Sequence, residues 1–124
     1  MPTSEEEVFT TWTSELEGHN VSVMCLCGEL DASTVPTFVS EVQDVIARHR
    51  DIIMDVHLLS YIDSTGVGTL LSTKNALRSG GKKICLVGCH GLLTKIIHMI
   101  RVERELKCFD DIETAVVEME TGSW

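Results

Sequence analysis

The sequence predicts a single α/β domain, in which a mixed β-sheet opens with a β-hairpin and packs against about four helices. The chain has 124 residues, enough for one domain with a hydrophobic core but too few for two. Two strand-like segments, 8–16 and 21–26, flank a turn at Gly18-His19-Asn20. After them, segments with helical periodicity alternate with short apolar runs, in the order ββαβαβα(β)α. That order is typical of a sheet with parallel strands.

The first helix is expected after the second strand, which Gly28-Glu29-Leu30-Asp31 is predicted to end. Asp31, Ser33 and Thr34 offer helix caps, and Pro36 suits a first helical turn. Apolar residues at helical spacing then extend the helix to about His49: Phe38, Val39, Val42, Val45 and Ile46.

The remaining elements follow from apolar runs and stop signals. Residues 51–56 are apolar enough to be buried on both faces, as parallel strands are, and 57–62 form a connection. A second helix begins near Ser64 and ends at Gly80-Gly81. A strand at 84–87, a helix at 91–100, a short strand at 107–109 and a helix at 112–120 complete the domain. We assign residues 1–7 to an acidic arm and 8–120 to the domain.

Charge and cysteine content limit the classes of function. The net charge of −9 disfavours direct binding to nucleic acid or to an anionic membrane. No apolar run approaches the roughly 18 residues of a membrane span, and the acidic N-terminal segment is unlike a secretory signal. A cytoplasmic protein is therefore expected. Its five cysteines are expected to be reduced and buried, without bound metal: Cys25, Cys27, Cys85, Cys89 and Cys108.

The segment Asp63-Ser64-Thr65-Gly66 is the most informative part of the chain. A serine at the start of a helix lies beside unpaired N–H groups and the positive end of the helix dipole. Such a position suits an N-cap and also a phosphate group, so Ser64 is either only a cap or also a switch. Both this segment and 28–31 fall at strand-to-helix junctions, and we expect them to lie side by side at one end of the sheet.

Motifs for catalysis are incomplete. Gly66-x-Gly68 lacks the third glycine of a dinucleotide fingerprint, since position 71 is Leu71, and Ile62 replaces the glycine that a nucleophile elbow requires. A phospho-aspartate receiver that uses Asp55 remains an alternative, but the adjacent acidic pair that would hold Mg²⁺ is missing. We therefore expect no catalytic residues, no metal and no cofactor.

Several segments together resemble the bacterial anti-sigma factor antagonists, which are single STAS-domain proteins. The resemblance rests on Gly-Glu-Leu-Asp at 28–31, Ile-Asp-Ser-Thr-Gly-Val-Gly at 62–68 and Gly-Gly-Lys at 80–82. The tail at 93–116 also fits the family's closing pattern. The resemblance covers about residues 8–118, and the order and spacing of the motifs make it fairly specific.

The resemblance implies a phosphorylation switch. An unmodified antagonist binds an anti-sigma factor that is also a serine kinase and thereby frees a sigma factor. The kinase phosphorylates the serine after the motif aspartate, here Ser64, and a PP2C-type phosphatase resets the protein; Thr65 is a second hydroxyl at the site. The free antagonist is expected to be a monomer. The expected partner surface consists of Asp31, Ser33, Asp63, Thr65, Gly66 and Val67.

The same resemblance leaves another output open. STAS domains also serve as scaffolds in sensory complexes, as ligand sensors and as tails of anion transporters. A phosphorylatable STAS scaffold or sensor without a sigma factor is therefore the alternative binding module.

Overall fold

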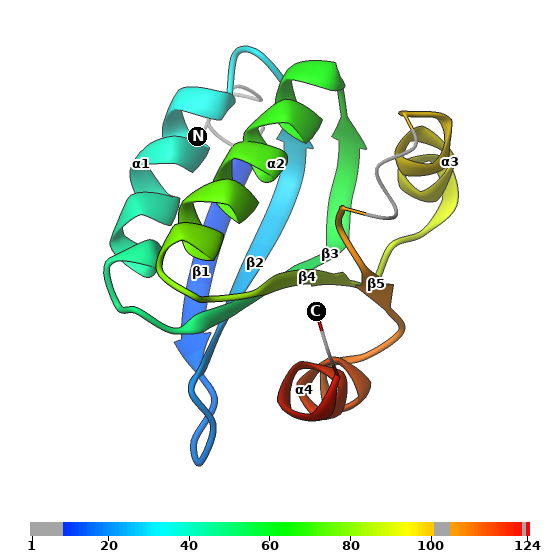
Figure 1. Cartoon of the computed structure of the whole chain (residues 1–124). Coiled ribbons are helices and arrows are strands. Elements are labelled where there is room, and N and C mark those ends of the chain that lie inside the picture. The colour runs from blue at the N-terminus through cyan, green and yellow to red at the C-terminus, as the bar shows by residue number, and fades with distance from the viewer. Residues whose placement is uncertain (1–8, 101–104, 123) are drawn as a thin grey trace.

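The computed structural model describes residues 9–100, 105–122 and 124, and it confirms the predicted fold class (Figure 1). The predicted arm, 1–7, lies outside the described residues. The elements follow the expected order: β1 (Phe9–Glu15), β2 (Val21–Leu30), α1 (Val35–Ile46), β3 (Asp51–Ile62), α2 (Ser64–Ser79), β4 (Ile84–Val87), α3 (Gly91–Ile100), β5 (Cys108–Phe109) and α4 (Ile112–Thr121).

The five strands form one mixed sheet in the order β1-β2-β3-β4-β5. β1 and β2 pair antiparallel, as the predicted hairpin requires, whereas β2, β3, β4 and β5 are parallel to one another. The helices between parallel strands provide the crossover connections that such pairing needs. Among the described residues, no helix is both long and apolar enough to cross a membrane.

Apolar side chains on the two faces of the sheet form two separate cores. The larger core lies between one face of the sheet and helices α1, α2 and α3, and it contains Phe38, Met54 and Leu70. The smaller core lies on the opposite face, where α4 packs through Ala115 and Met119 (Figure 1). Successive strand residues point to opposite faces, so β2 and β3 supply both cores. The sheet is thereby fixed from both sides.

Strands β2 and β3 are longer than the sequence indicated. We predicted that they would end at 26 and 56, but they continue to Leu30 and Ile62. Their pairing passes two irregularities, between Cys25 and Cys27 and between Gly28 and Glu29. Such bulges admit an extra residue and break the strict alternation that marks a strand in sequence. The predicted 57–62 connection is therefore part of β3.

Helix α1 is shorter than predicted. It ends at Ile46 instead of about His49, which has a φ of 56°. A left-handed backbone conformation at a residue with a side chain stops a right-handed helix.

The cysteines differ from the expectation of five reduced, buried thiols. Cys89 and Cys108 form a disulfide with their Cα atoms 6.7 Å apart, because parallel pairing of β4 and β5 brings together residues 19 positions apart. Cys25 and Cys27 are half-buried free thiols, and only Cys85 among the three free cysteines is fully buried. Burial, with a smaller contribution from the charge of Asp51, raises the pKa of the Cys85 thiol to about 12.

Candidate functional site

The two predicted loops meet where β2 and β3 end together. Leu30 pairs with Ile62 at the last position of the β2–β3 ladder. The backbone N–H of Asp63 then donates to the carbonyl of Leu30, with an N···O distance of 3.2 Å. The segment that follows β2 and the first turn of α2 therefore lie side by side at the carboxyl end of both strands (Figure 1). This arrangement confirms the expected proximity of 28–31 and 63–66.

Asp63, and not Ser64, caps helix α2. Asp63 has an extended backbone, and its carboxylate accepts a hydrogen bond from the N–H of Gly66 at 2.8 Å. Its carbonyl accepts the first helical hydrogen bond, from the N–H of Val67. An aspartate at this position satisfies an otherwise unpaired N–H and stabilises the positive end of the helix. The interpretation of Ser64 as only a cap is therefore wrong.

Ser64 is the first residue of α2, and its side chain is exposed. Among the described residues, the structure records no hydrogen bond to its hydroxyl. Thr65 is exposed as well, and its carbonyl accepts a hydrogen bond from the Thr69 hydroxyl one turn later. The Ser64 hydroxyl thus faces solvent at the positive end of a 16-residue helix, where the field favours a negative group.

Asp31 organises the neighbouring loop. One of its carboxylate oxygens accepts hydrogen bonds from the hydroxyl of Ser33 at 2.6 Å, from the N–H of Ser33 at 2.9 Å and from the N–H of Thr34 at 3.2 Å. The bond from the Ser33 hydroxyl contributes most to a lowered pKa of the Asp31 carboxyl. Asp31 therefore stays ionised at neutral pH and fixes the turn that leads into α1.

Thr34 has a larger part in this loop than the sequence suggested. Its hydroxyl donates to the carbonyl of Glu29 at 2.7 Å and accepts from the N–H of Asp31 at 2.9 Å. Thr34 occupies the N-cap position of α1, one of the positions that the sequence offered for a cap, but its hydroxyl makes no capping bond to the helix. The spacing Asp-x-Ser-Thr was the available signal, because aspartate and serine or threonine at such positions commonly bond the turn's own backbone.

Two members of the expected partner surface are buried. Gly66 lies directly against β2: an added Cβ would be 2.5 Å from the carbonyl oxygen of Leu30. Val67 is only 2% exposed and packs into the larger core, on the same side of α2 as Leu70. Helical periodicity turns this side toward the sheet, so neither residue offers a contact surface. Asp31, Ser33, Asp63 and Thr65 remain accessible at least in part.

Asp55, the residue of the receiver alternative, lies within β3 and not at its end. Its carboxylate is 2.6 Å from the Nδ1 atom of His57 and accepts the His57 N–H at 3.1 Å. The Cys25 thiol is 3.9 Å away. Within the part of the chain that the structure describes, no group of three or more His, Cys, Asp or Glu side chains is arranged to hold a metal ion. Asp110, Asp111 and Glu113 line the same hollow as Asp55, but these carboxylates do not form a metal-holding group of the kind that a Mg²⁺-dependent phospho-acceptor needs.

Comparison with known proteins agrees with this architecture. The family model of the STAS domain matches residues 15–115, and the chain therefore belongs to the STAS domain family.

Relatives of the chain carry a consistent name. An anti-sigma-B factor antagonist of Staphylococcus aureus is 36% identical over 66 residues, which cover 49% of this chain and 57% of that protein. The match thus spans little more than half the length of that relative.

Solved structures share the fold. An anti-sigma factor antagonist from Mycobacterium paratuberculosis superposes with a TM-score of 0.81 at 19% identity, over 92% of this chain and 96% of the other. The Bacillus cell fate determinant SpoIIAA, solved in its phosphorylated form, superposes with a TM-score of 0.62 at 22% identity, over 89% of this chain and 96% of the other.

Proposed function

We propose that this chain is an anti-sigma factor antagonist that phosphorylation of Ser64 switches off. In the unmodified state it binds a serine-kinase anti-sigma factor in the cytoplasm and thereby releases a sigma factor for transcription. Phosphorylation by the kinase ends the binding, and a PP2C-type phosphatase restores it. The chain acts as a binding module without catalysis of its own.

This proposal rests on the different positions of Asp63 and Ser64 at the start of α2. Asp63 caps the helix, so the exposed hydroxyl of Ser64 has no structural task among the described residues. A kinase can therefore approach the hydroxyl, and its modification removes no hydrogen bond that holds the fold. An acceptor with these properties can change charge without unfolding its own helix.

Electrostatics explains how a phosphate would release the partner. A phosphoserine carries roughly −1.5 to −2 charges at neutral pH. At position 64 this charge would lie beside Asp63 and near the Asp31 loop, where an interface would have to desolvate all three groups. A penalty of about 2.7 kcal/mol weakens binding about a hundredfold. The N-terminus of α2 meanwhile stabilises the phosphate in the free protein.

The comparisons support the same proposal without testing it on this chain. The Staphylococcus aureus relative is an anti-sigma-B factor antagonist, and SpoIIAA has been solved in a phosphorylated form. We infer a partner surface formed by Asp31, Ser33, Asp63 and Thr65 around Ser64. These side chains project from the loop after β2 and from the start of α2, both of which hydrogen bonds hold in place.

The first test is phosphosite mapping by mass spectrometry on the protein purified from its native host. We expect one phosphoryl group on Ser64, absent in Ser64→Ala and retained in Ser72→Ala. Ser72 is the matched control, since it is an exposed serine of the same helix whose hydroxyl donates only to the carbonyl of Gly68. A chain that stays unmodified across growth and stress conditions would refute the switch.

The second test identifies the output. Unmodified protein and Ser64→Asp are used as baits, and a serine-kinase anti-sigma factor should be retained by the first and lost from the second. Capture of a sensory complex without an anti-sigma factor would instead assign the chain to the scaffold alternative. Mg²⁺-dependent labelling by a small phosphodonor, lost in Asp55→Asn, would favour the receiver.

A further inference from the structure

Half of the lysines and arginines of this acidic chain surround one hollow. The chain has ten such residues and a net charge of −9. The cationic side chains that line the hollow are Lys74, Arg78, Lys82, Lys83 and Lys107. Among the described residues, Glu105 is the only acidic one that lines it, and Ile84 and Trp124 also contribute to the wall. The local charge therefore has the opposite sign to that of the whole protein, which attracts anions to this place.

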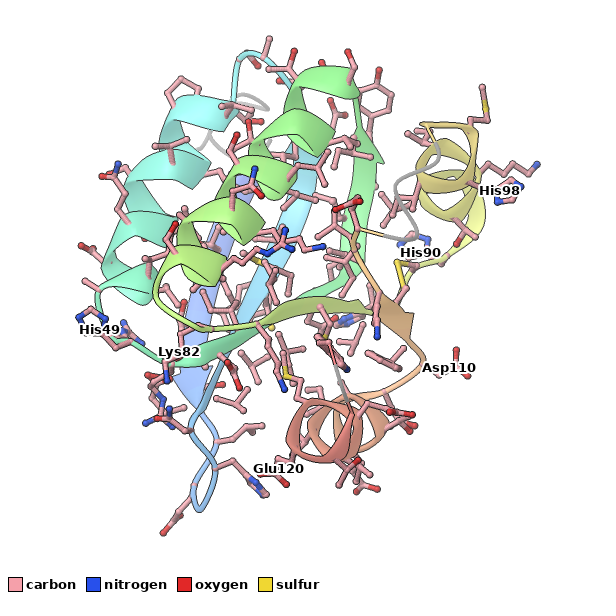
Figure 2. The ribbon with its side chains drawn as sticks, viewed as in Figure 1. His49, Lys82, His90, His98, Asp110 and Glu120 are labelled. Atoms are coloured by element: carbon pink, nitrogen blue, oxygen red, sulfur yellow. A yellow bond between two sulfur atoms is a disulfide. The ribbon has the colours of Figure 1, made fainter. Side chains whose placement is uncertain are left out.

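The hollow lies far from the Ser64 site. Its walls come from the last turns of α2, the start of β4, the segment that leads into β5, and Trp124. Figure 2 shows Lys82 on the connection between α2 and β4, at the end of α2 opposite to its first turn. A helix of 16 residues is about 24 Å long, so a ligand here would not touch Ser64. The volume of the hollow is about 260 Å³, which suits a small molecule rather than a folded partner.

Three of the five cations are held by the protein. The Lys74 ammonium pairs with the Glu105 carboxylate at 3.2 Å, and that of Lys83 donates to the carbonyl of Met119 at 2.8 Å. The Lys107 ammonium lies 4.7 Å from the centre of the Trp124 ring, a cation–π distance. These contacts fix the wall of the hollow and the position of its positive charges.

The other two cations, Arg78 and Lys82, have no such partner within the part of the chain that the structure describes. For the side chains of Arg78 and Lys82, no hydrogen bond or ion pair with the described residues is recorded. Arg78 lies in the last turn of α2, where a cation also stabilises the negative end of the helix dipole. That effect does not account for Lys82, Lys83 and Lys107, which come from other segments, nor for the aromatic wall. An anion bound between Arg78 and Lys82 would relieve the repulsion between the clustered charges.

We propose that this hollow binds a small polyanion whose charges are phosphate or carboxylate groups. Arg78 supplies a planar guanidinium that can bind such a group through two parallel hydrogen bonds, and Lys82 supplies a second charge. Lys83 and Lys107 hold Trp124 as one wall through contacts of 5.6 and 4.7 Å to the ring centre. The ligand joins α2, β4 and the segment before β5, so it stabilises their packing. This proposal does not depend on the function of Ser64.

The test uses the fluorescence of Trp124. The chain has two tryptophans, and Trp12 is 49% exposed on β1, so Trp12→Phe leaves Trp124 as the only tryptophan without disturbing the core. This protein is titrated with pyrophosphate and with citrate at constant ionic strength, and sodium chloride serves as the blank. We expect a saturable change in fluorescence and a rise in melting temperature. A response to pyrophosphate alone identifies phosphate as the recognised group, and a response to citrate alone identifies carboxylate.

Variants decide whether the hollow is responsible. Arg78→Gln and Lys82→Gln should each weaken binding about tenfold, because each removes one charged contact. Arg48→Gln is the matched control: this exposed arginine of the segment after α1 pairs with Glu15 at 3.1 Å, away from the hollow, and its loss should leave binding unchanged. The absence of saturation up to about 10 mM of either anion would overturn the proposal, as would equal binding by Arg78→Gln, Lys82→Gln and the parent protein.

Discussion

Replacement of Gly66 by alanine tests the contact that joins the two loops of the candidate site. An added Cβ at this position would lie 2.5 Å from the carbonyl oxygen of Leu30 and 2.8 Å from the Cγ1 atom of Ile62. The first of these is a backbone atom at the end of β2, which pairs with β3, so it cannot yield as the tip of a side chain could. The first turn of α2 would have to move away from β2.

The magnitude follows from two opposing effects. Overpacking of a well-filled site costs about 1–3 kcal/mol, and contact with fixed backbone places Gly66→Ala at the upper end. Alanine in place of glycine within a helix recovers about 1 kcal/mol. We expect a net loss of about 2 kcal/mol in the free energy of unfolding. For a domain of 124 residues this corresponds to a melting temperature lower by about 8 °C.

Gly68→Ala is the matched control, because Gly68 lies two residues further along the same helix with no atom within 4 Å of an added Cβ. It should stabilise the protein by up to about 1 kcal/mol. Urea unfolding followed by circular dichroism measures both free energies, and phosphorylation of each variant reports the Ser64 geometry. The reasoning is refuted if Gly66→Ala is as stable as the parent protein, or if both substitutions shift stability in the same direction.

Three further predictions concern the cap, the disulfide and the final helix. Asp63→Ala should lower the free energy of unfolding by about 1 kcal/mol in urea titrations while Asp63→Asn retains most of it; equal losses would contradict a capping role. The Cys89–Cys108 disulfide closes a 19-residue separation, so reductant should cost about 3 kcal/mol in denaturant unfolding and should not affect Cys108→Ser. The backbone N–H of Thr114 lowers the pKa of Asp111 from its usual 3.8. The stability that the ionised Asp111 carboxylate contributes is therefore complete above about pH 4, and it is lost as the pH falls through the lower pKa of the folded state. In Asp111→Asn, the midpoint of urea unfolding should therefore depend less on pH in this window.

Most of the fold could be predicted from local patterns. The hairpin, the strand at 84–87 and the helices predicted at 91–100 and 112–120 follow from apolar spacing, glycine stops and aspartate caps, which all act between residues close in sequence. The second halves of β2 and β3 escaped prediction because bulges interrupt their alternation. Only their pairing with each other shows that 28–30 and 57–62 belong to strands.

The location of the candidate site could be predicted from the sequence, but the structural roles of its residues could not. The order of the motif residues indicates a loop at a helix start, and the structure confirms that this loop adjoins 28–31. Sequence could not decide whether Asp63 or Ser64 caps α2, because either residue type suits an N-cap and the choice depends on one residue of register. Val67 was expected at the surface, yet the docking of α2 on the sheet buries it.

The sequence by itself therefore determined the class of fold, the order of its elements and a serine at the start of a helix, since each depends on interactions within a few residues. Tertiary structure alone decided three other features. It exposed Ser64 while assigning the cap to Asp63, it paired Cys89 with Cys108, and it gathered Arg78, Lys82 and Lys107 around one hollow. These features join residues that are distant in sequence or depend on the exact register of a helix, and only strand pairing and helix docking fix both.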